Sequence, residues 1–332
     1  PYFGMVDEKY GRVSFFEVLT TMAFAAFADA PVDVAVVETG MGGSWDATNV
    51  ADGTVSVITP ISLDHTDYLG PDVESIAAEK AGIIKAGATA VLSQQTVAAA
   101  EVLLRRAAEV GATVAREGLE FGVLHRELAV GGQLLHLRGL KGVYEDVFLP
   151  LYGEHQAGNA VTALAAVEAL TAGDEPLGDD LVRQAFAQVR SPGRLEVVRS
   201  GPTVIIDAAH NPGGMEASVD ALTEAFGFTR LIAVVAVMAD KDVDTILELL
   251  EPIVEEVVIS RNSSPRSMDA EELAERAESI FGQERVHLAP RLDDAIDLAI
   301  GLADEGDEFG SGVLITGSVA TAGDARVLLK VG

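Results

Sequence analysis

Hydrophobic positions in the first part of the chain form short apolar runs separated by segments with helical spacing. Apolar runs of strand length lie at Val32–Glu38, Val55–Pro60 and Ala88–Ser93. Segments whose apolar residues recur with the period of a helix lie at Val73–Ala81 and Thr96–Val110. Strands that are apolar on both faces and alternate with helices are typical of a parallel sheet. The pattern therefore predicts an α/β domain.

The segments on either side of this alternation have other patterns. Ser14–Ala30 is apolar nearly all round and predicts a buried helix. Over Ala112–Leu151, short alternating stretches separated by glycines predict an antiparallel ribbon. Helices are expected over Gln156–Leu170 and Gly178–Val189, before a turn at Ser191–Arg194.

The alternation of apolar strands and helices starts again after this turn. The expected strands are Thr203–Asp207, Leu231–Val237, Glu256–Ser260, Val286–Leu288 and Gly312–Thr316, and the expected helices are Pro212–Phe226, Val243–Leu250, Asp269–Phe281 and Leu292–Glu305. This pattern predicts a second doubly wound domain. We expect one domain over residues 1–197 and another over residues 198–332, because the turn separates two self-contained α/β patterns.

The charge balance is strongly acidic: 52 Asp and Glu against 23 Lys and Arg give a formal net charge of −29 over 332 residues. No basic cluster interrupts this negative field, so nucleic acid is not expected as a partner. The absence of cysteine excludes disulfides, thiolate metal sites and a cysteine nucleophile. The apolar runs are too short for a membrane span and the first residues lack a signal-peptide pattern, so a cytoplasmic location is expected.

Polar and glycine-rich segments follow the predicted strands of the first domain. Glu38 ends a strand, and the glycines after it let a ligand approach the backbone closely. A carboxylate there suits a Mg²⁺ ion beside a nucleotide triphosphate, although a surface acid before a plain turn has the same pattern. His65, between Asp64 and Asp67, suits a Mg²⁺ or phosphate site or a structural role. Lys80 is either a residue of the site or a solvated lysine on a helix.

Similar polar groups follow the later elements. Asn159 suits a contact to a nucleobase or phosphate, or a helix cap. Arg194 suits a pair with a γ-phosphate or an interdomain salt bridge. Asp207 could bind a ribose hydroxyl, and His210 with Asn211 could face a carboxylate substrate. Polar groups also follow two other predicted strands, at Asp240–Asp242 and Gly317–Ser318.

Seven motifs follow one another in a fixed order: Glu38–Asn49, Asp64–Gly70, Glu79–Ile83, His155–Asn159, Pro192–Arg194, Asp207–Pro212 and Asp240–Asp242. This order resembles the folylpolyglutamate synthase/dihydrofolate synthase family, a branch of the Mur ligase superfamily of ATP-dependent amide-forming ligases. The resemblance implies a Mur ligase-like central ATPase domain, truncated at its N-terminus, and a C-terminal Rossmann-like glutamate ligase domain. It also implies addition of L-glutamate to dihydropteroate or reduced folates through an acyl phosphate.

The resemblance further implies roles for single residues. Glu38 and His65 correspond to Mg²⁺ ligands, and Lys80 corresponds to a lysine carried as a carbamate. The implied ATP contacts are Asn159, Arg194 and Asp207, the pterin-binding residues are Phe15, Phe16, Trp45, Asp46 and Ala47, the glutamate-binding residues are His210 and Ser318, and the catalytic residues are Lys80, Arg194 and His210.

Two features depart from the family pattern. No Gly-Lys pair occurs anywhere in the chain, so a P-loop of the Gly-Lys-Ser/Thr type is missing. Gly43-Ser44-Trp45 stands where the family usually has Gly-Gly-Arg. We therefore expect this chain to be the C-terminal major part of a longer ligase, with impaired triphosphate binding as it stands.

Two alternative functions stay open at this point. Another Mur-type ligase, such as one that acts on peptidoglycan precursors, shares the fold and the ATP chemistry. A catalytically inactive folate-binding remnant is favoured by the missing P-loop. A dehydrogenase is disfavoured, because Gly40-Met41-Gly42-Gly43 lacks the G-x-G-x-x-G spacing. The expected partners are ATP with Mg²⁺, L-glutamate and dihydropteroate or a reduced folate, without a membrane, and the resemblance implies a monomer.

Overall fold

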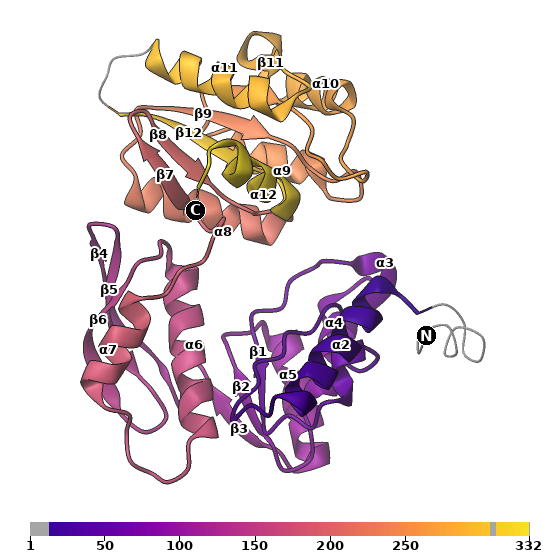
Figure 1. The fold of residues 1–332 in the computed structure, drawn as a ribbon, viewed down its shortest axis with the longest axis vertical. Helices are drawn as coiled ribbons and strands as arrows, with labels where there is room; N and C mark the ends of the chain where they lie inside the picture. The colour runs from indigo at the N-terminus through magenta and orange to yellow at the C-terminus, as the bar shows by residue number, and fades with distance from the viewer. Residues whose placement is uncertain (1–12, 306–309, 332) are drawn as a thin grey trace. The chain divides into compact units, whose positions relative to one another are not determined.

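The computed structural model describes residues 13–305 and 310–331, and their backbone forms two compact units (Figure 1). The first unit takes in the chain up to Gly122 together with residues 139–141 and 162–175. The second takes in residues 123–138, residues 142–161 and the chain from Pro176 onward. Both units are therefore built from segments that are discontinuous in the sequence.

The first unit contains a three-stranded parallel sheet in the order β1-β2-β3. Side chains of Ile76 and Leu103, from two different helices, are buried with Leu92 of the sheet in one core. The strands are β1 (Val55–Ile58), β2 (Thr89–Leu92) and β3 (Thr113–Arg116), and the helices are α2 (Phe15–Asp29), η1 (Ala47–Val50), α3 (Thr66–Leu69), α4 (Val73–Lys80), η2 (Ala81–Ile83) and α5 (Val97–Val110).

The predicted strand Val32–Glu38 is wrong for this structure. These residues form no strand, and Val36 is 95% exposed. A strand is held by backbone hydrogen bonds to a neighbour, and within the described residues β1 pairs only with β2. The helix α2 forms as predicted, with a capping box between Ser14 and Glu17, but none of its residues is buried. Among the described residues, the apolar character of this helix therefore does not lead to full burial of any of its side chains.

The predicted antiparallel ribbon lies in the second unit, in the strand order β4-β5-β6 with β5 and β6 antiparallel. It is shorter than predicted, because Thr113–Arg116 pairs in parallel with β2 as β3. Arg126 of the ribbon donates hydrogen bonds of 2.7 Å to Gln133 and to Glu224, which lies in a later helix of the same unit. The strands are β4 (Gly122–Ala129), β5 (Gly132–Arg138) and β6 (Val143–Leu149), and α7 (Asp179–Ala187) packs on β6.

The helix α6 (Glu154–Leu170) follows the ribbon and belongs to the second unit through Val161. The remainder of the second unit is a six-stranded sheet in the order β11-β10-β9-β12-β8-β7, parallel except for the β7–β8 pair. Five strands are those predicted, and β7 is an additional edge strand. They are β7 (Glu196–Ser200), β8 (Thr203–Ile206), β9 (Arg230–Val235), β10 (Glu256–Ile259), β11 (Val286–Leu288) and β12 (Ser311–Thr316).

Helices cover both faces of this sheet (Figure 1). Ile205 and Leu314 point into one core, whereas their neighbours Ile206 and Ile315 point into the other. This double burial explains why the strands are apolar throughout. The first core includes α8 (Pro212–Ala225), α9 (Val243–Leu250) and α10 (Ala270–Phe281), the second includes α11 (Leu292–Asp304) and α12 (Val319–Leu328), and η3 (Gln283–Arg285) follows α10.

Along the described residues, no helix is both long enough and apolar enough to cross a membrane.

Candidate functional site

The glycine-rich loop of the first unit is held in shape by Asp46, which is 7% exposed. Its Oδ2 accepts a hydrogen bond of 2.9 Å from the N–H of Met41, and its Oδ1 accepts from the N–H and the hydroxyl of Thr48 at 2.9 and 2.6 Å. Burial acts to raise the pKa of Asp46, but hydrogen bonds from Thr48, Met41 and Gly40 outweigh it and keep the pKa below its ordinary 3.8. Asp46 therefore stays ionised and organises the loop from inside.

Glu79 fastens the same loop to the end of α4. The hydroxyl of Ser44 donates to Glu79 Oε2 at 2.6 Å, and the N–H of Trp45 donates to Oε1 at 3.2 Å. The N–H of Ser44 also donates to the carbonyl oxygen of Glu79 at 3.0 Å. Gly43 lies directly against that carbonyl, so a side chain there would collide with backbone. The loop and the end of α4 thus form one packed structure.

The predicted metal ligands of this unit do not form a cluster. Glu38 is exposed in an irregular segment, and His65 is exposed with a left-handed φ of 53°. Lys80 is half-buried as the last residue of α4. Across residues 13–305 and 310–331, no group of three or more His, Asp and Glu is placed to hold a metal ion. These residues therefore do not by themselves fit a Mg²⁺ site, and the roles of Glu38, His65 and Lys80 stay predictions.

The predicted pterin-binding residues surround the glycine-rich loop. Trp45 follows the Ser44 anchor and is 56% exposed, and Ala47 opens η1 directly after Asp46. The ring of Phe16 lies against Gly40 at the start of the loop, whereas Phe15 is 79% exposed. Exposed aromatic faces beside a rigid loop provide a surface on which a flat ring can stack.

Asp207 is the centre of the polar cluster in the second unit. It follows β8 at the carboxyl edge of the sheet and is 3% exposed. Its Oδ2 accepts from the N–H of Leu195 at 3.0 Å, and its Oδ1 accepts from the N–H of Ala209 at 2.9 Å and from the hydroxyl of Ser218 at 2.8 Å. Both carboxylate oxygens thus accept hydrogen bonds inside the protein, and the ribose contact of Asp207 stays a prediction.

The turn that carries Arg194 is fixed on both sides of this exposed arginine. The N–H of Ala208 donates to the carbonyl oxygen of Gly193 at 2.8 Å. The N–H of Gly193 donates to Glu196 Oε2 at 2.9 Å, and Glu196 also pairs with Arg326 of α12. Arg194 itself is exposed. The turn therefore fixes the backbone around an exposed arginine beside the carboxyl edge of the sheet, where its guanidinium can pair with a phosphate.

His155, near the start of α6, lies within electrostatic reach of this cluster. Burial lowers the pKa of its imidazole below the ordinary 6.5, Asp207 opposes the shift, and the charges of Arg194 and Arg126 add to it. Asn159 is exposed one turn further along the helix, and its side-chain amide donates to Gln156 at 3.4 Å. The first turns of α6 and the Arg194 turn therefore belong to one electrostatic environment within the second unit.

The two predicted glutamate-binding residues have different surroundings. His210 is half-buried, and its Nδ1 lies 3.0 Å from the carbonyl oxygen of Ala208; because a carbonyl only accepts, Nδ1 carries the proton. Ser318 is 1% exposed, caps α12 through the N–H of Thr321 at 3.0 Å, and accepts from Asn262 at 3.1 Å. The hydroxyl of Ser318 thus makes its hydrogen bonds inside the protein.

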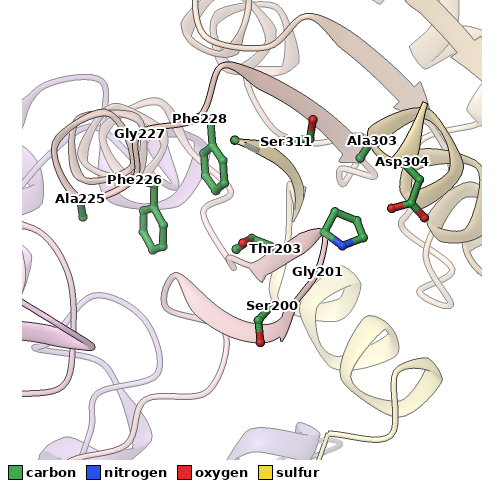
Figure 2. A pocket seen from close by; sticks show the side chains of 12 residues that line it. Ser200, Gly201, Thr203, Ala225, Phe226, Gly227, Phe228, Ala303, Asp304 and Ser311 are labelled. Atoms are coloured by element: carbon green, nitrogen blue, oxygen red, sulfur yellow. The ribbon is translucent and has the colours of Figure 1, made fainter. Parts of the chain in front are cut away.

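One hollow of the second unit lies away from these polar residues. It has a volume of about 680 Å³ and is lined by the stacked rings of Phe226 and Phe228, whose centroids are 5.5 Å apart (Figure 2). Thr203 and Ser311, which also line it, begin the parallel strands β8 and β12. It therefore lies at the amino edge of the sheet, opposite the edge at which α/β sheets bind ligands.

Sequence reasoning missed Ser218 as part of the cluster. It is a buried serine in the middle of α8, and only its partner Asp207 distinguishes it from an ordinary helix residue. The role of Glu79 as the anchor of the glycine-rich loop was also missed, although its motif was recognised. The spacing of residues along the sequence gives no indication of either contact.

Family models match most of the chain: a Mur ligase middle domain matches residues 12–167, and a Mur ligase glutamate ligase domain matches residues 193–319. Dihydrofolate synthase/folylpolyglutamate synthase of Mycobacterium tuberculosis is 55% identical over 95% of this chain and 68% of its own length. The enzyme of the same name from Bacillus subtilis is 31% identical over 99% of this chain and 76% of its own.

Solved structures of folylpolyglutamate synthases are also similar to this chain. The M. tuberculosis folylpolyglutamate synthase complexed with ADP and AMPPCP superposes with a TM-score of 0.94 at 54% identity, over 99% of this chain and 76% of that one. Escherichia coli FolC in complex with DHPP and ADP gives a TM-score of 0.83 at 30% identity, over 97% and 72%. With its Mur ligase domains and these relatives, the chain belongs to the dihydrofolate synthase/folylpolyglutamate synthase family of ATP-dependent, amide-bond-forming ligases.

Proposed function

We propose that this protein adds L-glutamate to dihydropteroate, to reduced folates or to both, with ATP as the energy source. The observation that carries the proposal is the cluster around Asp207, which holds the Arg194 turn at the carboxyl edge of a doubly wound sheet. It is supported by relatives that carry these names and by a relative whose solved structures contain ADP and AMPPCP.

The chemistry explains why an arginine is needed there. A carboxylate oxygen of the pterin substrate attacks the γ-phosphorus of ATP, and ADP leaves, which gives an acyl phosphate. The amine of glutamate then attacks the acyl carbon and loses a proton, and inorganic phosphate leaves as the amide forms. Arg194 would pair with phosphoryl oxygens, whose charge spreads during transfer. His210, whose Nδ1 contacts the carbonyl oxygen of Ala208, would orient the glutamate.

Finer assignments stay predictions of the sequence. They are the Mg²⁺ ligands Glu38 and His65, the carbamate on Lys80, the contact of Asn159 with ATP, the pterin contacts of Phe15, Phe16, Trp45, Asp46 and Ala47, the monomeric state and the cytoplasmic location. No step of the reaction above depends on them.

The test measures glutamate-dependent ADP release with dihydropteroate, with tetrahydrofolate and with a UDP-muramoyl substrate, and identifies the product by mass spectrometry. We expect a product one glutamyl residue heavier from a pterin substrate only. Release with the UDP-muramoyl substrate alone would assign another Mur-type ligase. Pterin binding without ADP release would favour a folate-binding remnant.

A further inference from the structure

Arg194 is followed by a residue in an unfavourable backbone conformation. Leu195 has a φ of 43°, in the left-handed region that non-glycine residues avoid. Its side chain is 3% exposed and packs in the core between the sheet and α8. Such a conformation persists only when the surroundings impose it, and it fixes the direction in which the preceding arginine leaves the turn.

The carboxylate of Asp207 is the group that imposes it. The N–H of Leu195 donates to Asp207 Oδ2 at 3.0 Å, with both residues buried. Oδ2 meets this N–H while Oδ1 of the same carboxylate accepts from the N–H of Ala209. The geometry of the Arg194 turn therefore depends on what holds that carboxylate in its rotamer.

Ser218 supplies this hold from α8. Its side chain is 5% exposed, and its hydroxyl donates to Asp207 Oδ1 at 2.8 Å. We propose that Ser218 is a positioning residue: through Asp207 it keeps Leu195 in its left-handed conformation and so aims Arg194 at the nucleotide. The last step rests on the proposed function, in which Arg194 contacts ATP.

The turn is also held by contacts that do not involve Ser218, so the contribution of Ser218 can be measured separately. Glu196 holds Gly193 from the other side of the turn and pairs with Arg326. Loss of the Ser218 hydroxyl should therefore loosen the Leu195 side of the turn without releasing the whole segment.

The experiment compares Ser218→Ala with Ser218→Thr, which keeps the hydroxyl, and with Thr223→Ala, which removes an exposed hydroxyl from the same helix. Hydrogen exchange at the Leu195 amide, affinity for ADP and the urea unfolding midpoint are measured for each full chain. For Ser218→Ala we expect about tenfold faster exchange at Leu195 and about tenfold weaker ADP binding, the scale of one hydrogen bond to a charged group. Ser218→Thr should restore both values, and Thr223→Ala should match the unchanged protein.

The outcomes separate this proposal from the proposed function. Unchanged exchange at Leu195 in Ser218→Ala would overturn the positioning role, as would faster exchange spread evenly over the whole second unit. Faster exchange at Leu195 alone, in a chain that binds no ADP with or without the substitution, would support the hold on the turn and count against the nucleotide function.

Discussion

Ser44 and Glu79 are joined by a hydrogen bond of 2.6 Å between a hydroxyl and a carboxylate. Glu79 also accepts from the N–H of Trp45, so one side chain at the end of α4 fixes two consecutive residues of the glycine-rich loop. The loop therefore holds its shape without the arginine that the family usually has in this stretch.

Glu79→Ala should weaken binding of dihydropteroate about tenfold, because removing a charged hydrogen-bond partner releases the loop that carries Trp45. Trp45 is the single tryptophan of the chain, so its fluorescence reports on this loop alone. A fluorescence titration with dihydropteroate measures the affinity, and Glu74→Ala, an exposed position in the first turn of α4, is the control. Equal affinities in the two variants would contradict the anchoring role of Glu79.

Arg194→Ala should weaken binding of ATP about tenfold or more, because it removes a charged donor to the phosphates, while stability changes little at this exposed position. Arg194→Lys should give an intermediate affinity, since an ammonium keeps the charge but loses the planar fork. Calorimetric titration measures both. Arg190→Ala, also exposed and close in sequence, serves as the control, and a loss of affinity as large as that of Arg194→Ala would argue for a merely general charge effect.

His155 should make the second unit less stable in mild acid. Because its pKa is lowered in the folded state, the unfolded chain binds the proton more readily. Its contribution to stability is therefore complete above the ordinary pKa of 6.5 and is lost as the pH falls toward the folded value. His155→Gln should flatten the pH dependence of the unfolding free energy below that point, as measured by urea unfolding at several pH values. An unchanged slope, equal to that of the exposed control His125→Gln, would refute this account.

Glu168 of α6 should contribute strongly to the first unit. It is fully buried, and its Oε2 accepts hydrogen bonds from the N–H groups of Leu140 and Lys141. Glu168→Gln replaces an acceptor by an amide and should cost about 1–3 kcal/mol of unfolding free energy. Thermal unfolding of this variant and of Glu101→Gln, an exposed position on α5, measures the difference. A loss no greater than that of the control would show that the buried carboxylate is dispensable.

The parallel strands were predictable because helices cover both sides of them. Val204–Ile206 and Leu231–Val235 are buried throughout. A strand that is buried on both faces has a continuous apolar sequence, which can be recognised. Val32–Glu38 has the same apolar pattern but pairs with no strand in the part of the chain that the structure describes, and pairing is not encoded in the run itself. Strands β3 and β7 were missed because exposed polar residues interrupt them, and α12 because its hydrophobic pattern is weak.

The residues of the candidate site also differ in whether the sequence alone could identify them. A motif that follows a strand, such as Asp207 after β8, could be identified from the sequence, because strand ends gather at one edge of the sheet. Hydrogen-bond partners that lie on a different helix could not be identified from the sequence. The contact of Ser218 with Asp207, and that of Glu79 with Ser44, exist only once α8 and α4 have packed.

The ion pair between Arg126 and Glu224 joins positions 98 residues apart. At about 5–20 residues per second, a ribosome that has made Arg126 needs roughly 5–20 s more to deliver Glu224. The ribbon thus leaves the ribosome well before the helix that neutralises its arginine. Until α8 has been made, Arg126 lacks the carboxylate with which it pairs in the folded unit.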